Sequence, residues 1–211
     1  PILQSLAKGF EMNKIFIHEQ IQTIVTKADP VLEISLSHQD KTAVLKTHIP
    51  GIYNLENIEA AIMIGIFFEI EWEEIIKAIA AYKPKANRSK WIKMDTNDIL
   101  LDAYNANPTS MKAAIDNFKM MEVDKKMVIL GDMRELGAVS AIEHQAVIDL
   151  LIKENFDVVW LVGEEFAKTR SEFRKFKNAD DVKAAIALEH PAGYHILIKG
   201  SNGIHLSELA S

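Results

Sequence analysis

The residues with the most hydrogen-bonding chemistry form one short stretch, D-A-Y-N-A-N-P-T-S-M at positions 102–111. Asn107 followed by Pro108 predicts the start of a helix, because asparagine caps helices and proline is favoured in their first turn. That structural role leaves Asp102 and the polar residues after it unexplained. A strand end beside a helix N-terminus offers free N–H groups and a positive dipole, which suit an anionic ligand. A carboxylate there can accept hydrogen bonds from a sugar diol, and amides can hold amide or carboxylate groups.

The elements that must position this stretch alternate between strand and helix. Strands are expected at 99–101, 127–130, 158–162 and 196–198. Helices are expected at 109–121, 141–153, 164–173 and 181–188, with a capping box at Ser140-Ala141-Ile142-Glu143. This alternation predicts an α/β fold with a doubly wound, mainly parallel sheet. Ligands bind such sheets at the carboxyl ends of the strands, which here carry Asp102, Gly131-Asp132, Gly163-Glu164 and Lys199-Gly200-Ser201. Turn preference alone explains each of these corners equally well.

The first part of the chain predicts a smaller unit. Strands at 32–37 and 43–47 flank a polar turn and predict a hairpin. Two helices are expected at about 54–68 and 72–82, from the spacing of their apolar residues. Pro84 ends the second helix, so residues 83–87 are the predicted linker.

Composition excludes several kinds of protein. The 211 residues are 48% hydrophobic and 26% charged, as in an ordinary soluble globular protein. The absence of cysteine excludes disulfides and thiolate metal sites and permits a reducing compartment. A net charge of −6 without a block of like charges argues against a nucleic-acid partner. The longest apolar stretch, 60–68, is too short to span a bilayer, and no signal peptide is visible. The histidine spacing does not suit zinc, and neither a P-loop nor a dinucleotide fingerprint is present.

Four motifs, in order and spacing, resemble the Mur ligase family. Residues 102–111 are similar to the family's D-[SA]-Y-N-A-N-P-x-S-M, and residues 51–61 to its G-x-[HY]-N-x-x-N-x-x-A-A helix. Residues 130–137, with His144 beyond them, are similar to L-G-D-M-x-E-L-G…H, and residues 198–201 to V-K-G-S. The resemblance runs over the whole chain. It points to the members that add D-alanyl-D-alanine to UDP-N-acetylmuramoyl-tripeptide.

The resemblance implies a three-domain, ATP-dependent acid–amino-acid ligase of peptidoglycan synthesis that acts through an acyl phosphate. Residues 1–84 would be the tail of its partial α/β central ATPase domain, and residues 85–211 its Rossmann-like C-terminal domain. The chain starts with Pro1 rather than Met, and we expect a fragment that is inactive alone. The phosphate-binding lysine and the Mg²⁺ ligands would lie upstream, so no catalytic or metal residue is assigned here. A cytoplasmic monomer is expected, with ATP, UDP-N-acetylmuramoyl-tripeptide and D-alanyl-D-alanine as partners and neither nucleic acid nor membrane.

The resemblance also implies roles for individual residues. ATP binding would involve Asn54 and Asn57 at the adenine, Arg88 at a phosphate or the ribose, and Asp102 at the ribose. The dipeptide and acyl-phosphate region would involve Tyr104, Asn105, Asn107, Lys199 and Ser201. Structural alternatives remain open, because the asparagines can cap helices and the lysine can be solvated. Structural roles are expected for Asp132, Glu135 and His144.

Asn202 departs from the family pattern, which has arginine after K-G-S, so one expected positive charge is missing from this corner. Two other functions stay open. One is a ligase of the Mur or folylpolyglutamate type with a different acceptor, which the 102–111 stretch argues against. The other is an α/β binding module without catalysis. The linker at 83–87 is the predicted hinge of a domain closure over ATP.

Overall fold

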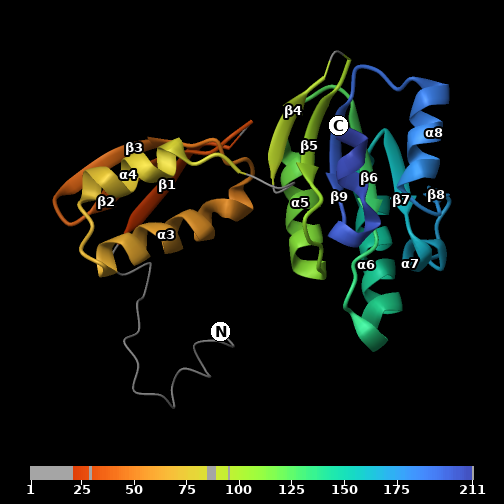
Figure 1. Cartoon of the computed structure of the whole chain (residues 1–211), viewed down its shortest axis with the longest axis horizontal. Helices are drawn as coiled ribbons and strands as arrows, with labels where there is room; N and C mark the ends of the chain where they lie inside the picture. Colours follow the sequence, from red (N-terminus) through yellow and green to blue (C-terminus); the bar gives the residue numbers. More distant parts are fainter. Residues whose placement is uncertain (1–20, 29, 85–88, 95, 211) are drawn as a thin grey trace.

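The computed structural model describes residues 21–28, 30–84, 89–94 and 96–210 (Figure 1). These residues form two β-sheets, one of three strands and one of six. The first sheet lies before residue 47 and the second after residue 89. The division expected at residues 84 and 85 falls between these two sheets. The boundary itself stays a prediction, because residues 85–88 lie outside the described part of the chain.

The first sheet is antiparallel, and its strands are β1 (Gln22–Lys27), β2 (Glu33–His38) and β3 (Lys41–Lys46). The predicted hairpin is confirmed as the pair β2 and β3, whereas β1 matches no strand range expected from the sequence. Two helices pack against this sheet, α3 (Leu55–Phe67) and α4 (Trp72–Ala81), both close to the predicted bounds. They share a core with the sheet, made by residues that include Leu32, Ile34, Leu45, Ile62 and Trp72.

The second sheet has the order β4-β5-β9-β6-β7-β8. Its strands are β4 (Lys90–Lys93), β5 (Asp98–Asp102), β6 (Lys126–Gly131), β7 (Val158–Val162), β8 (Arg174–Phe176) and β9 (His195–Lys199). Only β4, at one edge, is antiparallel to its neighbour; the other described pairs are parallel. The predicted α/β fold with a mainly parallel sheet is therefore confirmed.

Helices cover both faces of this sheet. They are α5 (Pro108–Met120), α6 (Ser140–Glu154), α7 (Glu164–Ala167) and α8 (Ala179–Glu189). Successive strand residues face opposite cores: Leu100 and Leu197 pack in the core of α5 and α6, and Ile99 and Ile196 in that of α8. Because both faces are buried, the strands read as continuous apolar runs, and the polar residues are left for the strand ends.

Two expected helix features are wrong. The helix predicted at 164–173 ends at Ala167, where the Thr169 hydroxyl donates to the Phe166 carbonyl at 2.6 Å and the chain turns toward β8. The capping box predicted at Ser140 does not form, since Ser140 is the first residue of α6 and no side chain caps that helix. The Ser140 hydroxyl instead donates to Glu165 Oε2 at 2.7 Å.

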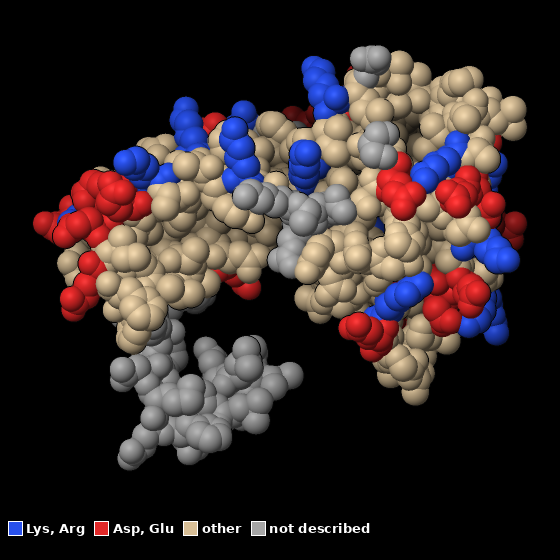
Figure 2. All heavy atoms as spheres, viewed as in Figure 1, with Lys and Arg blue, Asp and Glu red and all other residues tan. Residues whose placement is uncertain are grey.

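On the face shown in Figure 2, acidic and basic side chains are interspersed over the six-stranded unit. Within the described ranges, no helix has the length and apolar character that a bilayer crossing requires.

Candidate functional site

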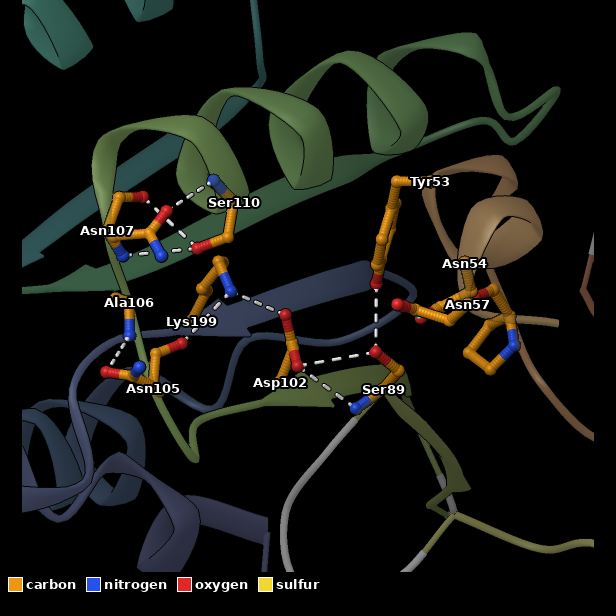
Figure 3. A network of polar contacts seen from close by, with 11 residues as sticks. Tyr53, Asn54, Asn57, Ser89, Asp102, Asn105, Ala106, Asn107, Ser110 and Lys199 are labelled. Atoms are coloured by element: carbon orange, nitrogen blue, oxygen red, sulfur yellow. Dashed lines mark hydrogen bonds and ion pairs between the residues drawn. The ribbon is translucent and has the colours of Figure 1, made fainter. Parts of the chain in front are cut away.

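The centre of the candidate site is an ion pair between two neighbouring strand ends. Parallel pairing sets Asp102, the last residue of β5, opposite Lys199, the last residue of β9. Lys199 Nζ lies 2.5 Å from Asp102 Oδ2 and also donates to the Asn105 carbonyl at 3.3 Å (Figure 3). Lys199 is 1% exposed and Asp102 is 9% exposed, so the charges attract each other in a medium that screens them little. These two strand ends lie at one edge of the sheet, as expected from the sequence, and the structure adds that they pair directly.

The second oxygen of Asp102 binds Ser89, the residue directly before β4. Asp102 Oδ1 accepts from the Ser89 amide at 3.1 Å and from the Ser89 hydroxyl at 3.3 Å. The Ser89 hydroxyl in turn lies 3.0 Å from the Tyr53 hydroxyl (Figure 3). Burial, and then the negative charge of Asp102, raise the pKa of Tyr53, so its hydroxyl keeps its proton at neutral pH. Hydrogen bonds thus run from Tyr53 through Ser89 and Asp102 to Lys199.

Asn54 and Asn57 lie beside this chain of contacts, at the start of α3. The Asn54 amide donates to the Pro50 carbonyl at 2.7 Å, and its oxygen accepts from Asn57 at 3.2 Å. Neither contact caps the helix, so the alternative that Asn54 caps α3 through its side chain is wrong. Both asparagines line a pocket of about 500 Å³, mostly apolar, that Ser89 also lines. A flat aromatic base with polar edges would suit such a lining.

The loop between β5 and α5 contains residues that cap the helix and an exposed aromatic side chain, that of Tyr104. Asn107 Oδ1 accepts from the Ser110 amide at 2.8 Å while the Ser110 hydroxyl accepts from the Asn107 amide at 3.1 Å, which makes a complete capping box. The predicted cap with proline in the first turn is confirmed. The Asn105 side chain accepts from the Ala106 amide at 2.9 Å, and Tyr104 is 42% exposed.

A second polar corner surrounds Ser201 and Asp132. The Ser201 hydroxyl accepts from the Arg134 amide at 2.8 Å, and the Ser201 amide donates to the Asp132 carbonyl at 3.1 Å. The Asp132 carboxylate accepts from the Glu165 and Phe166 amides, both at 2.9 Å, and so caps α7. The structural role expected for Asp132 is confirmed.

His144 is also structural, as expected. It is 0% exposed, and its Nε2 accepts from the Met133 amide at 3.0 Å. Its Nδ1 lies 2.8 Å from the Ser140 carbonyl and must donate there. With one nitrogen accepting and the other donating, the ring is neutral, so it holds the 131–137 loop against α6 rather than carrying charge.

Sequence reasoning left out two members of the network. Tyr53 lies inside the motif at 51–61, and its position there was a usable signal. Ser89 has no motif of its own, and only the structure shows that it contacts Asp102. Arg88, predicted to bind ATP, lies outside the described residues.

The family resemblance implies two bound groups, ATP and Mg²⁺, and the described residues fit only the first. The pocket beside Asn54 and Asn57 offers amides and apolar surface, which fit a purine nucleotide. Magnesium requires several oxygen ligands around one point. In the part of the chain that the structure describes, no group of three or more histidine or acidic side chains could hold a metal ion. These residues therefore do not fit a magnesium site.

Solved structures share this fold. MurF from Thermotoga maritima in complex with ADP superposes with a TM-score of 0.75 at 19% identity, over 90% of this chain and 45% of that one. MurF from Acinetobacter baumannii gives a TM-score of 0.72 at 24% identity, over 89% of this chain and 43% of the other. At these identities the likeness shows the fold alone.

Sequence comparison gives the family. The chain is 34% identical over 174 residues to the UDP-N-acetylmuramoyl-tripeptide–D-alanyl-D-alanine ligase of Bacillus subtilis, covering 76% of this chain and 38% of the relative. The ligase of the same name from Treponema pallidum is 30% identical, covering 78% and 38%. The chain thus spans about two fifths of the length of these curated relatives. The model of the "Mur ligase, glutamate ligase domain" matches residues 87–202. The chain belongs to the Mur ligase family.

Proposed function

We propose that the whole protein is an ATP-dependent ligase that joins D-alanyl-D-alanine to UDP-N-acetylmuramoyl-tripeptide. The observation that carries the proposal is the network in Figure 3. It joins the pocket beside Asn54 and Asn57 to the paired strand ends Asp102 and Lys199. A nucleotide in that pocket would have its ribose and phosphates near the corner where an acceptor could meet them. Relatives of that name, at 34% and 30% identity, support the choice of substrates.

In this proposal the tripeptide carboxylate attacks the terminal phosphate of ATP, and ADP leaves. The dipeptide amine then attacks the acyl phosphate, loses a proton, and expels phosphate. Such chemistry depends on positioning and on stabilising developing charge. The residues of this chain would bind and orient: Asn54, Asn57, Arg88 and Asp102 at the nucleotide, and Tyr104, Asn105, Asn107, Lys199 and Ser201 at the dipeptide end. These roles, a cytoplasmic location and a monomeric state remain proposals.

In this structure the side chains of Asp102 and Lys199 bind mainly to each other. The two groups use much of their hydrogen-bonding capacity within the protein. One lone pair on Asp102 Oδ2 remains for a ribose hydroxyl. For Lys199 to reach a dipeptide carboxylate, the ion pair would have to open.

The test is a comparison of acceptors with the whole protein. Phosphate release is measured with ATP, UDP-N-acetylmuramoyl-tripeptide and either D-alanyl-D-alanine, D-glutamate or L-glutamate. We expect the highest kcat/KM for the dipeptide. A preference for either glutamate would favour a ligase with a different acceptor. No acceptor-dependent phosphate release at all would favour a non-catalytic module.

A further inference from the structure

A large cleft lies at the carboxyl ends of β6 and β7, and β6 pairs with β9, the strand that ends at Lys199. Its volume is about 840 Å³, and loops around residues 131–137, 163–165, 177–180 and 203–208 line it. Side chains of both charges contribute to the lining, including Arg134 and Lys177. A cleft that mixes charges in this way suits a small zwitterion, which carries an amine and a carboxylate.

Most acidic groups of this cleft already have partners inside the protein. The Asp132 carboxylate caps α7 through two amide hydrogen bonds. Glu165 binds Lys168 and Ser140, and these hydrogen bonds lower its pKa, so it stays ionised and engaged. The guanidinium of Arg134 differs, because it makes no ion pair with any carboxylate of the described residues. A guanidinium without a partner at a cleft wall is well suited to bind a carboxylate from a ligand.

The backbone fixes where this guanidinium lies. The Arg134 amide donates to the Ser201 hydroxyl at 2.8 Å, which ties the loop after β6 to the loop after β9. The guanidinium packs over Gly203, where an added Cβ would lie 2.6 Å from Arg134 Nη1. Gly203 directly follows Asn202, so the charge of Arg134 lies close to this part of the loop after β9.

We propose that Arg134 binds the carboxylate of the acceptor dipeptide. This inference rests on the proposed function. Lys199 is a poorer candidate, because it is 1% exposed and its charge is paired with Asp102 at 2.5 Å. Lys177 lines the same cleft from the loop after β8 and has no recorded ion pair among the described residues, so it is a matched control.

The first test is steady-state kinetics of the whole protein and its variants. We expect R134A to raise the KM for D-alanyl-D-alanine by about tenfold or more, the loss of one charged hydrogen-bond partner. The KM for ATP and the KM for the UDP-linked substrate should stay within about twofold of the wild-type values, since the R134A substitution removes no proposed contact with either substrate. K177A removes a cation of the same cleft and should raise the KM for the dipeptide less than R134A does.

Two further measurements separate binding from a structural role. Adding N202R to R134A should restore most of the lost affinity, because the charge returns to the same corner. Wild-type protein should prefer D-alanyl-D-alanine over its C-terminal amide, and R134A should lose most of that preference.

Three results would overturn the inference. An active wild type with an R134A variant of unchanged dipeptide KM would show that Arg134 does not bind the acceptor. Equal losses for the acid and the amide would show that Arg134 acts only on structure. A wild type without dipeptide-dependent phosphate release would refute the proposed function, and this inference with it, whatever the R134A variant does.

Discussion

At the scale of single residues, the main feature is the buried ion pair of Asp102 and Lys199, in which each charged group is hydrogen-bonded by protein atoms instead of water. Asp102 receives hydrogen bonds from Ser89 and Lys199, and Lys199 has a further acceptor in the Asn105 carbonyl. Burying two charges is costly, and the attraction between them offsets that cost only when geometry and extra hydrogen bonds are good. Both conditions hold here, so each partner depends strongly on the other.

We predict that D102N destabilises the protein by about 3–5 kcal/mol, because it leaves the Lys199 ammonium buried without a counter-charge. Urea unfolding of the variant and the wild type measures the difference. D116N, which breaks the exposed pair with Lys112, is the control and should cost less than about 1 kcal/mol. A D102N variant as stable as D116N would show that the buried pair is solvated in solution.

At the scale of elements, helix starts and strand ends determine the site. The Asn107 cap could be predicted because all its partners lie within three residues of it. β4 (Lys90–Lys93) is not predicted, since two apolar residues between two lysines give too short a pattern. α7 was predicted too long, because pairing of β8 with β7 is a long-range effect that helical spacing cannot show. Ser140 matched a capping box, but Glu165, 25 residues away, takes its hydroxyl.

The site residues show the same contrast between local features, which the sequence predicts, and long-range contacts, which it does not. Strand-end residues such as Asp102 and Lys199 could be predicted, because parallel strands present their carboxyl ends at one edge. Ser89 could not, since its contact with Asp102 depends on how β4 pairs with β5. The pairing of Lys199 with Asp102 was equally hidden, because 97 residues separate the two in sequence.

Gly163 provides a prediction for the start of α7. Its φ is +121°, and an added Cβ would lie 2.2 Å from Asp132 Oδ2, the carboxylate that caps this helix. We predict that G163A destabilises by more than the roughly 1–3 kcal/mol that this glycine-specific backbone conformation alone costs. G193A is the matched control, because Gly193 has φ +78° with nothing near its Cβ position. Thermal unfolding of both variants compares them. Equal losses would mean that the clash with Asp132 is relieved by a small shift.

At the scale of the whole molecule, hydrogen bonds between described residues join the N-terminal unit to the six-stranded unit. Tyr53 binds Ser89, the Ile52 amide donates to Asn117 Oδ1 at 3.1 Å, and Trp91 Nε1 donates to the Pro30 carbonyl at 2.6 Å. The expected hinge at 83–87 stays a prediction, because residues 85–87 lie outside the described part of the chain.

Tyr53 makes this junction sensitive to alkaline pH. Its pKa is raised in the folded state, whereas an unfolded tyrosine loses its proton at about pH 10. The stabilisation from this group is therefore complete below about pH 10 and is lost as pH rises above it, by up to about 1.4 kcal/mol per pH unit. We predict that the stability difference between wild type and Y53F shrinks above pH 10, measured by urea unfolding. Y82F, which removes a half-exposed hydroxyl, is the control. A difference that stays constant to pH 11 would contradict the burial of Tyr53.

The most direct test of the proposed ligase activity is to identify the product that the whole protein forms. ATP, UDP-N-acetylmuramoyl-tripeptide and D-alanyl-D-alanine are incubated with it, and nucleotides and sugar peptides are identified by mass spectrometry. We predict UDP-N-acetylmuramoyl-pentapeptide, formed together with equal amounts of ADP and phosphate. Release of ADP and phosphate without any pentapeptide, or the same amount of product when the dipeptide is replaced by D-glutamate, would contradict it.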